Sequence, residues 1–162
     1  MNLLVTNTGT TTAYVIIRAL RPHAQKIIAT TIRGQPSKAA YSRLVDKRYC
    51  VPSPVEDWKA GNITKENTER EASYIQAIQS ICETEKIDTI YPSHDAYGYV
   101  FSKNKERFKK IGVLIPIPDY ETVITPLDKY RTAQAAQRVG FPCPRTYLPE
   151  NDEHLERIAE EL

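Results

Sequence analysis

Short apolar runs and helix-spaced apolar residues alternate along the first third of the chain. Residues 2–6 form a short apolar run, which is typical of a buried strand. Turn-forming residues follow, and apolar side chains then recur at the three-and-four spacing of a helix that ends at Pro22: Ala13, Ile16, Ile17 and Leu20. Residues 26–32 are rich in isoleucine and threonine and predict a second buried strand. Residues 49–51 predict a short third strand that prolines stop.

The middle of the chain continues this alternation. Prolines, a glycine and an asparagine make residues 52–64 a predicted surface loop. A polar helix is expected over residues 66–86, with one buried stripe: Ala72, Ile75, Ile78 and Cys82. Residues 87–91 predict a strand and residues 112–117 the last clear strand. Between them, residues 95–110 predict a helix with one apolar face: Tyr97, Val100, Phe101 and Phe108.

This order of elements predicts an α/β fold with a doubly wound, mainly parallel sheet and helices on both faces. A parallel connection must cross back over the sheet, and a helix is the usual means of crossing. The sheet would contain the strands near Leu3, Ile28, Ile90 and Leu114, with Val51 at an edge. Right-handed crossovers would then fix the direction of winding.

A second group of signals follows the last predicted strand. Thr125, Pro126 and Asp128 predict a helix start, since they supply a hydroxyl cap, a proline at the first helical position and a capping-box acid. Gly140 and Pro142 mark the end of that helix. A final helix then carries an apolar stripe with little sequence left to cover it: Leu155, Ile158, Ala159 and Leu162. We therefore expect a piece of a longer protein, the alternative being a natural terminal helix that docks on the sheet.

Composition and charge narrow the class of protein. The 162 residues are 41% hydrophobic and 26% charged, which describes a globular domain with part of a second one and excludes a collagen, a coiled coil or a disordered tail. The 22 basic residues are dispersed among 20 acidic ones, so no nucleic-acid partner is indicated. No apolar run approaches the ~20 residues that span a bilayer, and no leader-like segment precedes the first strand. The sequence thus predicts a cytoplasmic protein without a membrane partner.

The three cysteines indicate neither a metal site nor a disulfide framework. Cys50, Cys82 and Cys143 are far apart, and their neighbours are apolar residues or prolines. We interpret them as reduced, structural thiols rather than catalytic ones.

Two loops form the candidate binding site, because ligands of a doubly wound sheet bind beyond the carboxyl ends of its strands. The first loop follows residues 2–6 and opens a helix, so its N–H groups and hydroxyls can meet an anion: Thr8, Gly9, Thr10 and Thr11. A single glycine leaves the loop without the dinucleotide fingerprint, and it lacks the P-loop lysine. Ligand contact and simple capping of its own helix are equally open.

The second loop follows residues 87–91 and contains Ser93, His94 and Asp95. It can bring an imidazole and a carboxylate over the same crevice. A pair of this kind is more often a helix cap, which Ser93 or Asp95 can supply while His94 is solvated. We favour the cap and keep substrate binding as the alternative; an anion bound to this chain would lie between the two loops.

Several motifs in order resemble the ATP-grasp enzymes. Asp128-Lys129 followed by residues 140–146 resembles the junction between their N-terminal preATP-grasp domain and the ATP-grasp domain proper. Residues 87–92 resemble that domain's apolar strand ending in proline, and residues 111–119 its next strand and turn. Ser42-Arg43, with the Tyr-Cys-Val-Pro run after it, is similar to the carbamoyl-phosphate synthase large-chain-like branch. The resemblance covers essentially the whole chain.

The resemblance implies a Rossmann-like preATP-grasp domain over residues 1–125, followed by a connecting helix and the truncated start of an ATP-grasp domain over residues 126–162. The full-length protein would be a ligase that uses ATP and Mg²⁺ to activate a small-molecule carboxylate as an acyl phosphate for attack by an amine or similar nucleophile. Lys129 matches the family's lysine that reaches ATP. The magnesium-binding acids and the second lysine belong to sequence beyond Leu162, so this chain alone would be inactive. The first loop departs from the several glycines of many relatives.

Two other classes remain open. One is a stand-alone small-molecule binding or regulatory module of flavodoxin-like fold, complete at Leu162. The other is a Rossmann-like enzyme that uses a nucleotide sugar or a dinucleotide, against which the glycine-poor first loop argues. A homodimer is compatible with each class, and neither the acid nor the nucleophile follows from fold-level analogy.

Overall fold

The computed structural model of the chain describes residues 1–54 and 68–161. It divides into two compact units, Met1–Tyr120 and Glu121–Leu162, each of which is described by itself. Most of the loop predicted over residues 52–64 and the first residues of the predicted helix over 66–86 lie outside the described residues. Whether the second unit begins an ATP-grasp domain stays a prediction.

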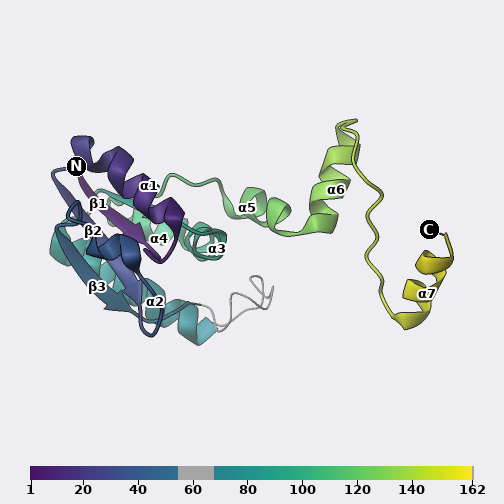
Figure 1. The fold of residues 1–162 in the computed structure, drawn as a ribbon, viewed down its shortest axis with the longest axis horizontal. Coiled ribbons are helices and arrows are strands. Elements are labelled where there is room, and N and C mark those ends of the chain that lie inside the picture. Colours follow the sequence, from purple (N-terminus) through teal and green to yellow (C-terminus); the bar gives the residue numbers. More distant parts are fainter. Residues whose placement is uncertain (55–67, 162) are drawn as a thin grey trace. The chain divides into compact units, whose positions relative to one another are not determined.

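A four-stranded, all-parallel sheet forms the centre of the first unit (Figure 1). Its strands are β1 (Asn2–Thr6), β2 (Lys26–Ile32), β3 (Lys47–Val51) and β4 (Thr89–Pro92), in the order β3-β2-β1-β4. Leu4 of β1 lies opposite Ile28 of β2 and Ile90 of β4. The predicted doubly wound α/β fold with a parallel sheet is confirmed, and β3 is an edge strand as expected for Val51.

Helices connect these strands on both faces of the sheet (Figure 1). In chain order they are α1 (Thr11–Leu20), η1 (Arg21–His23), η2 (Lys38–Tyr41), α2 (Thr68–Glu85), α3 (Asp95–Lys103) and α4 (Lys105–Lys109). From β1 to β3 the strands are added in one direction, and β4 is then added on the other side of β1. Because parallel crossovers are right-handed, this reversal puts α1 on one face of the sheet and α2 on the other.

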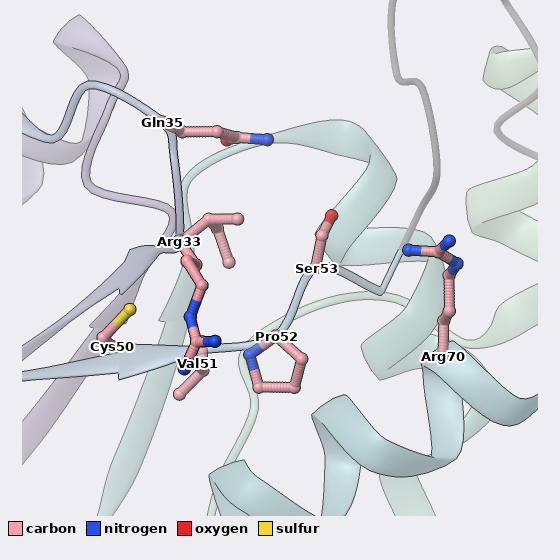
Figure 2. A pocket seen from close by; sticks show the side chains of 8 residues that line it. Arg33, Gln35, Cys50, Val51, Pro52, Ser53 and Arg70 are labelled. Carbon is pink, nitrogen blue, oxygen red and sulfur yellow. The ribbon is translucent and has the colours of Figure 1, made fainter.

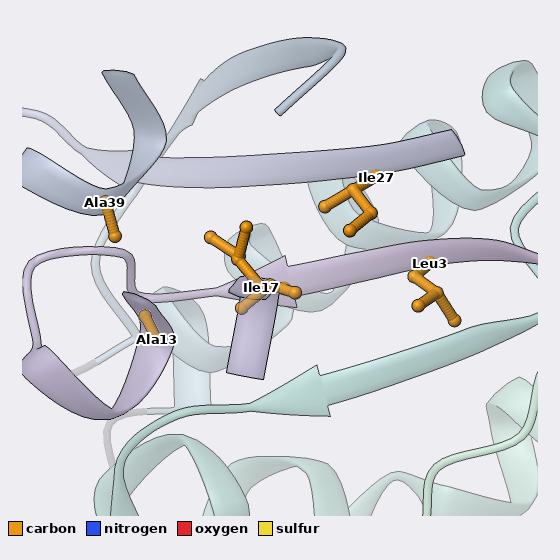
Figure 3. Close-up of a cluster of buried hydrophobic side chains, with 6 residues drawn as sticks. Leu3, Ala13, Ile17, Ile27 and Ala39 are labelled. Atoms are coloured by element: carbon orange, nitrogen blue, oxygen red, sulfur yellow. The ribbon is translucent and has the colours of Figure 1, made fainter. Parts of the chain in front are cut away.

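The side chains of β1 and β2 alternate between two apolar layers, since successive residues of a strand point to opposite faces. One layer joins the strands to α1 and η2 (Figure 3) and consists of Leu3, Val5, Ala13, Ile17, Ile27 and Ala39. In the other layer Leu4, Ile28 and Ile90 are fully buried. On that face α2 packs on α3 through Tyr74, whose ring meets those of Tyr97 and Phe101 edge to face at 5.6 and 5.8 Å.

Two elements are shorter than the sequence predicts. The strand expected over residues 112–117 is a single parallel bridge between Leu114 and Thr89, and Pro116, which has no N–H to donate, stops its extension. The helix expected over residues 95–110 breaks at Asn104, whose side-chain amide donates to the Val100 carbonyl at 2.9 Å. That bond uses an acceptor at the end of α3 and favours a helix terminus.

The buried face of α2 differs from the expected stripe at one position. Ala72 is exposed, whereas Glu71 is buried. The Glu71 carboxylate pairs with the Lys103 ammonium of α3 at 3.0 Å, which turns this acid toward the interior and its neighbour Ala72 toward solvent. The remaining buried residues on this helix are Tyr74, Ile75, Ile78, Ile81, Cys82 and Glu85.

The second unit contains most of α5 (Tyr120–Leu127), then α6 (Lys129–Arg138) and α7 (Asp152–Glu161). The predicted cap for the helix after Pro126 is wrong, because Thr125 lies within α5 and donates to the Glu121 carbonyl at 3.0 Å. Asp128 caps α6 instead, since its carboxylate accepts two N–H groups, those of Tyr130 and Arg131, at 2.9 and 3.0 Å. Gly140, with φ of 73°, follows the end of α6 as predicted.

The amino end of the sheet is held by a nearly buried acid. Glu85, the last residue of α2, accepts hydrogen bonds from Lys26 of β2, from Lys47 of β3 at 2.6 Å and from the Tyr49 hydroxyl. Its side chain is 5% exposed. The hydrogen bonds from Lys26, Lys47 and Tyr49 lower the pKa of Glu85 from 4.5 to about 2, and the Glu85 carboxylate raises the pKa of Lys47 in turn.

We expect Glu85→Gln to lower the free energy of unfolding at neutral pH, because an amide cannot neutralise two ammonium groups. A carboxylate whose pKa is lowered by folding contributes stability above its unfolded pKa of 4.5 and loses it as the pH falls toward about 2. The difference between wild type and variant should therefore be constant above pH ~5 and vanish near pH ~2. Urea unfolding at a series of pH values measures it.

Glu83→Gln, at an exposed position of the same helix, is the matched control and should leave stability nearly unchanged. A difference between wild type and Glu85→Gln that stays constant from pH ~5 to pH ~2 would contradict the assignment.

Candidate functional site

The two predicted loops lie side by side at the carboxyl edge of the sheet. Thr6, the last residue of β1, is opposite Pro92, the last residue of β4. Because the winding reverses between these strands, the connections that leave them diverge to opposite faces, and ligands of doubly wound sheets commonly bind at such a place. Residues 7–10 lead from β1 into α1, and residues 93–94 lead from β4 into α3.

Ser93 joins the two loops. Its hydroxyl lies 2.7 Å from the Thr6 carbonyl and 2.8 Å from the Asn7 carbonyl, to which it donates. The Thr10 hydroxyl lies 3.0 Å from the Ser93 hydroxyl and accepts the Ala13 N–H at 3.1 Å as the N-cap of α1. Ser93 is buried. The hydroxyls of Ser93 and Thr10 thus fix the loops to each other, and their contact with a substrate stays a prediction.

Thr8 and Gly9 anchor the first loop to the next strand and to the segment after it. The Thr8 hydroxyl donates to the Thr30 carbonyl at 2.7 Å, and the Thr8 carbonyl accepts the Ala39 N–H at 3.1 Å. A Cβ atom on Gly9 would lie 2.5 Å from the carbonyl oxygen of Pro36. Position 9 therefore requires glycine because another part of the backbone approaches it closely. Thr11 is the first residue of α1 and is exposed.

His94 caps α3, which corrects the assignment of that cap to Ser93 or Asp95. The Nδ1 atom of His94 accepts the Ala96 N–H at 3.2 Å, which a ring nitrogen can do only when it carries no proton itself. Ser93 is unsuited to this role because its hydroxyl is bonded to the first loop. Asp95 is the exposed first residue of α3. A helix cap is present, as the sequence favours, and substrate binding by Ser93, His94 and Asp95 stays a prediction.

The two loops lead into helix N-termini. α1 and α3 both begin there, and the first N–H groups of a helix attract anions. Within residues 1–54 and 68–161, no group of three or more His, Cys, Asp or Glu side chains could hold a metal ion. In the same part of the chain, no helix is long and apolar enough to cross a membrane.

Lys129 lies in the second unit as the first residue of α6, next to the capping residue Asp128. Its side chain is exposed. A single exposed ammonium group fits a contact with a phosphate oxygen but does not make a complete nucleotide site. Its predicted role with ATP stays a prediction.

A second cavity, which the sequence analysis missed, lies at the carboxyl ends of β2 and β3 (Figure 2). It has a volume of about 520 Å³ and is lined by Ile32, Arg33, Gln35, Cys50, Val51, Pro52, Ser53 and Arg70. A signal for it was present, because Arg33 and Ser53 closely follow two predicted strands whose carboxyl ends share one edge of the sheet. No sequence signal brings Arg70 of α2 to the same place.

This chain is similar to known proteins in structure. No protein-family model matches the chain, and no curated protein matches it. The biotin carboxylase domain of a single-chain bacterial carboxylase superposes with a TM-score of 0.63 and 16% identity, over 99% of this chain and 34% of that one. A single-chain, multi-domain long-chain acyl-CoA carboxylase superposes with a TM-score of 0.63 and 16% identity, over 97% of this chain and 14% of that one. The pyruvate carboxylase from Rhizobium etli superposes with a TM-score of 0.57 and 16% identity, over 93% of this chain and 13% of that one.

The parallel sheet and the two loops at its switch point define a doubly wound, Rossmann-like α/β domain. More particularly, the fold is that of a preATP-grasp domain, which carboxylases of this kind carry at their N-terminus. The fold implied by the sequence resemblance is thereby confirmed. The chain spans about a third or less of the length of these structures.

We expect Gly9→Ala to lower the free energy of unfolding by about 1–3 kcal/mol, because the new methyl group would force the first loop away from the Pro36 carbonyl. The N–H signals of residues 8–11 should also move in an NMR spectrum. Urea unfolding and amide chemical shifts measure the two effects.

Gly98→Ala is the matched control. A Cβ atom at this position of α3 meets no atom within 4 Å, so the substitution should raise the free energy of unfolding by roughly 0.5–1 kcal/mol through helix propensity. Equal stability of Gly9→Ala and wild type would contradict the close approach.

Proposed function

We propose that this chain is the N-terminal part of an ATP-dependent carboxylate ligase of the carbamoyl-phosphate synthase large-chain-like kind. The observation that carries the proposal is the preATP-grasp fold combined with the order of motifs along the sequence. The loops after β1 and β4 lie at its switch point, and Lys129 begins the first helix that lies wholly in the second unit.

In this proposal the two loops orient an acidic substrate. Ser93 holds the loops together through the Thr6 carbonyl, so the N-terminal N–H groups of α1 and α3 keep a fixed direction toward the crevice. A carboxylate there would accept those N–H groups and be stabilised by the dipoles of both helices. His94, the cap of α3, lies at the same edge and is proposed to contact the substrate together with Ser93 and Asp95.

Lys129 adds a positive charge for a nucleotide phosphate. When bound, ATP with Mg²⁺ supplies the phosphoryl group that activates the acid. The ammonium of Lys129 acts as a point charge on a phosphate oxygen, an attraction that is strong only where a closing domain excludes water. The ligase is proposed to be cytoplasmic, with a small carboxylate and ATP as its partners and no nucleic-acid or membrane partner.

The test of the proposed function uses the reading frame that continues past Leu162. A polypeptide extended by about two hundred residues, the size of a further domain, should release ADP only when Mg²⁺, a small carboxylic acid and an amine are all present. The chain of 162 residues should release none. A reading frame that stops at Leu162, or an extended protein that binds no ATP, would favour the stand-alone binding module.

We expect Lys129→Ala to weaken ATP binding by about 10- to 100-fold in the extended protein, because it removes one charge-assisted hydrogen bond. In the chain of 162 residues the same substitution should change almost nothing, since an exposed pair is worth only about 0–1 kcal/mol. Calorimetry with ATP and Mg²⁺ on all four proteins measures the difference.

Lys109→Ala, another exposed lysine, serves as the control and should leave ATP affinity unchanged in both lengths. Unchanged affinity on Lys129→Ala in the extended protein would remove this residue from the nucleotide site. Tight, Lys129-dependent ATP binding by the short chain would contradict the need for a second domain.

We also expect small anions to contact the switch-point loops of this chain. Titration with acetate should shift the N–H signals of residues 8–11 and 93–95 in an NMR spectrum, because these groups begin two helices. Potassium chloride at equal ionic strength is the control. Shifts confined to the amino end of the sheet would count against the crevice as the anion site.

A further inference from the structure

The charges of this chain are divided unevenly along the sequence. Lysine and arginine outnumber aspartate and glutamate by only 22 to 20 over the whole chain, but residues 1–54 contain eight of the basic residues and a single acid, Asp46. That acid is already paired, since its carboxylate lies 2.6 Å from the Arg21 guanidinium. The part of the chain that forms β1, α1, β2, η2 and β3 therefore has a surplus of positive charge.

Only some of these basic residues are neutralised within the fold. Glu85 pairs with both Lys26 and Lys47 at the amino end of the sheet. Three others are exposed and form no ion pair with any residue that the structure describes: Lys38, Arg43 and Arg48. These three follow one another through η2, the connection after it and β3.

Lys38 and Tyr41 share one side of η2, because side chains three residues apart in a 3₁₀ helix lie on the same side. The two alanines between them are buried. Figure 3 shows Ala39 directed toward the apolar layer that η2 shares with α1. The side with Lys38 and Tyr41 therefore faces solvent, and Tyr41, a large aromatic residue, is 68% exposed.

Arg48 of β3 reaches the same place. The side chain of its neighbour Lys47 pairs with Glu85 of α2, so that of Arg48 points to the opposite face of the sheet, where η2 lies. Its guanidinium carbon is 4.5 Å from the centre of the Tyr41 ring, within reach of a cation–π interaction. The name η2–β3 surface is used below for four residues: Lys38, Tyr41, Arg43 and Arg48.

The η2–β3 surface combines residue types that protein–protein interfaces favour. Tyrosine and arginine are enriched at interfaces and supply much of their binding energy. The guanidinium groups of Arg43 and Arg48 present forked N–H donors that match the two oxygens of a carboxylate. Since Asp46 is paired with Arg21, no other acid of residues 1–54 competes for these donors.

η2 is held in place by backbone hydrogen bonds. The Ala39 N–H donates to the Thr8 carbonyl and the Ala40 N–H to the Ser37 carbonyl, both at 3.1 Å. Thr8 is fixed in turn, because its hydroxyl donates to the Thr30 carbonyl at 2.7 Å. A surface that is ordered in advance loses less conformational entropy when a partner binds.

We propose that the η2–β3 surface binds a short acidic segment of a partner protein. Charge complementarity selects an acidic occupant, and three cations around one aromatic ring favour a short one. Nucleic acids are bound by longer basic stripes, and anionic lipids by clusters of about four to eight cations. Acids outnumber basic residues in the rest of the chain, which would repel a long polyanion. The proposal does not depend on the proposed ligase function.

A labelled acidic peptide tests this proposal. Fluorescence anisotropy with fluorescein-labelled hexaglutamate should show saturable binding in about 50 mM potassium chloride that weakens as the salt concentration rises. Labelled hexaglutamine, which lacks the charges, should not bind. In an NMR spectrum, hexaglutamate should shift the N–H signals of residues 38–43 and 47–49 with the same midpoint as the anisotropy.

Charge reversals distinguish this surface from a general attraction between charges. Arg48→Glu and Lys38→Glu should each weaken hexaglutamate binding by about ten-fold or more, because each replaces an attraction with a repulsion. Arg107→Glu, at an exposed position of α4, changes the net charge by the same amount and should bind like wild type. Circular dichroism verifies folding, and Lys38→Glu with the NMR mapping of wild type suffices if Arg48→Glu unfolds.

Each outcome decides the proposal. Saturable binding that the two reversals weaken and Arg107→Glu leaves unchanged supports it. Absence of binding, equal weakening in all three variants, or shifts confined to residues outside 38–49 would overturn it. Hexauridylate, a single-stranded RNA, is the competing probe, and binding about ten-fold tighter than that of hexaglutamate would overturn the assignment to an acidic protein segment in favour of a nucleic acid. The acetate shifts of residues 8–11 should persist in Arg48→Glu, so failure of this surface and failure of the switch-point loops are distinguishable.

Discussion

The carboxyl edge of the sheet depends on the hydrogen bonds that the Ser93 hydroxyl forms. Parallel pairing aligns Thr6 with Pro92, but beyond those residues the two chains diverge toward opposite faces. Ser93 bridges this divergence by donating to the carbonyls of Thr6 and Asn7 and by meeting Thr10, the cap of α1. One buried side chain thus satisfies backbone groups that the sheet leaves unpaired and sets the spacing of two helix N-termini.

The amino edge and the carboxyl edge of the sheet differ in how their charged and polar groups are paired. At the amino edge, Glu85 gathers charges from β2 and β3, and Asn2 donates its N–H to the Asp88 carboxylate at 2.6 Å. Opposite charges are paired there, which stabilises the fold and leaves little to attract a ligand. At the carboxyl edge, α1 and α3 begin, and their first N–H groups can meet an anion. Binding sites of a doubly wound sheet are therefore expected at this edge.

The elements that the sequence predicts well are those governed by local periodicity. The bounds of β2 match the prediction, and α1 and α6 end where it puts their ends, because buried strands, a proline and a glycine act within a few residues. The predictions are wrong where a residue far away in the sequence determines which side chain is buried or which residue caps a helix. Glu71 is buried in place of Ala72 because it pairs with Lys103 of α3. His94 caps α3 because the Ser93 hydroxyl is hydrogen-bonded to the loop after β1. Neither partner is visible in local spacing.

The same limit applies to the two candidate sites, and it explains why one was anticipated and the other was not. The switch-point loops each follow an apolar strand, so the topology rule alone brings them together. The second cavity includes Arg70 of α2, and no local spacing pattern brings this residue to the ends of β2 and β3.

One residue of α3 contacts both places. Tyr97 of α3 meets the ring of the capping residue His94 at 6.3 Å and is hydrogen-bonded to Ser53 of the second cavity. Because Tyr97 is buried and its pKa is raised to about 12 by that burial, it remains a neutral phenol at physiological pH.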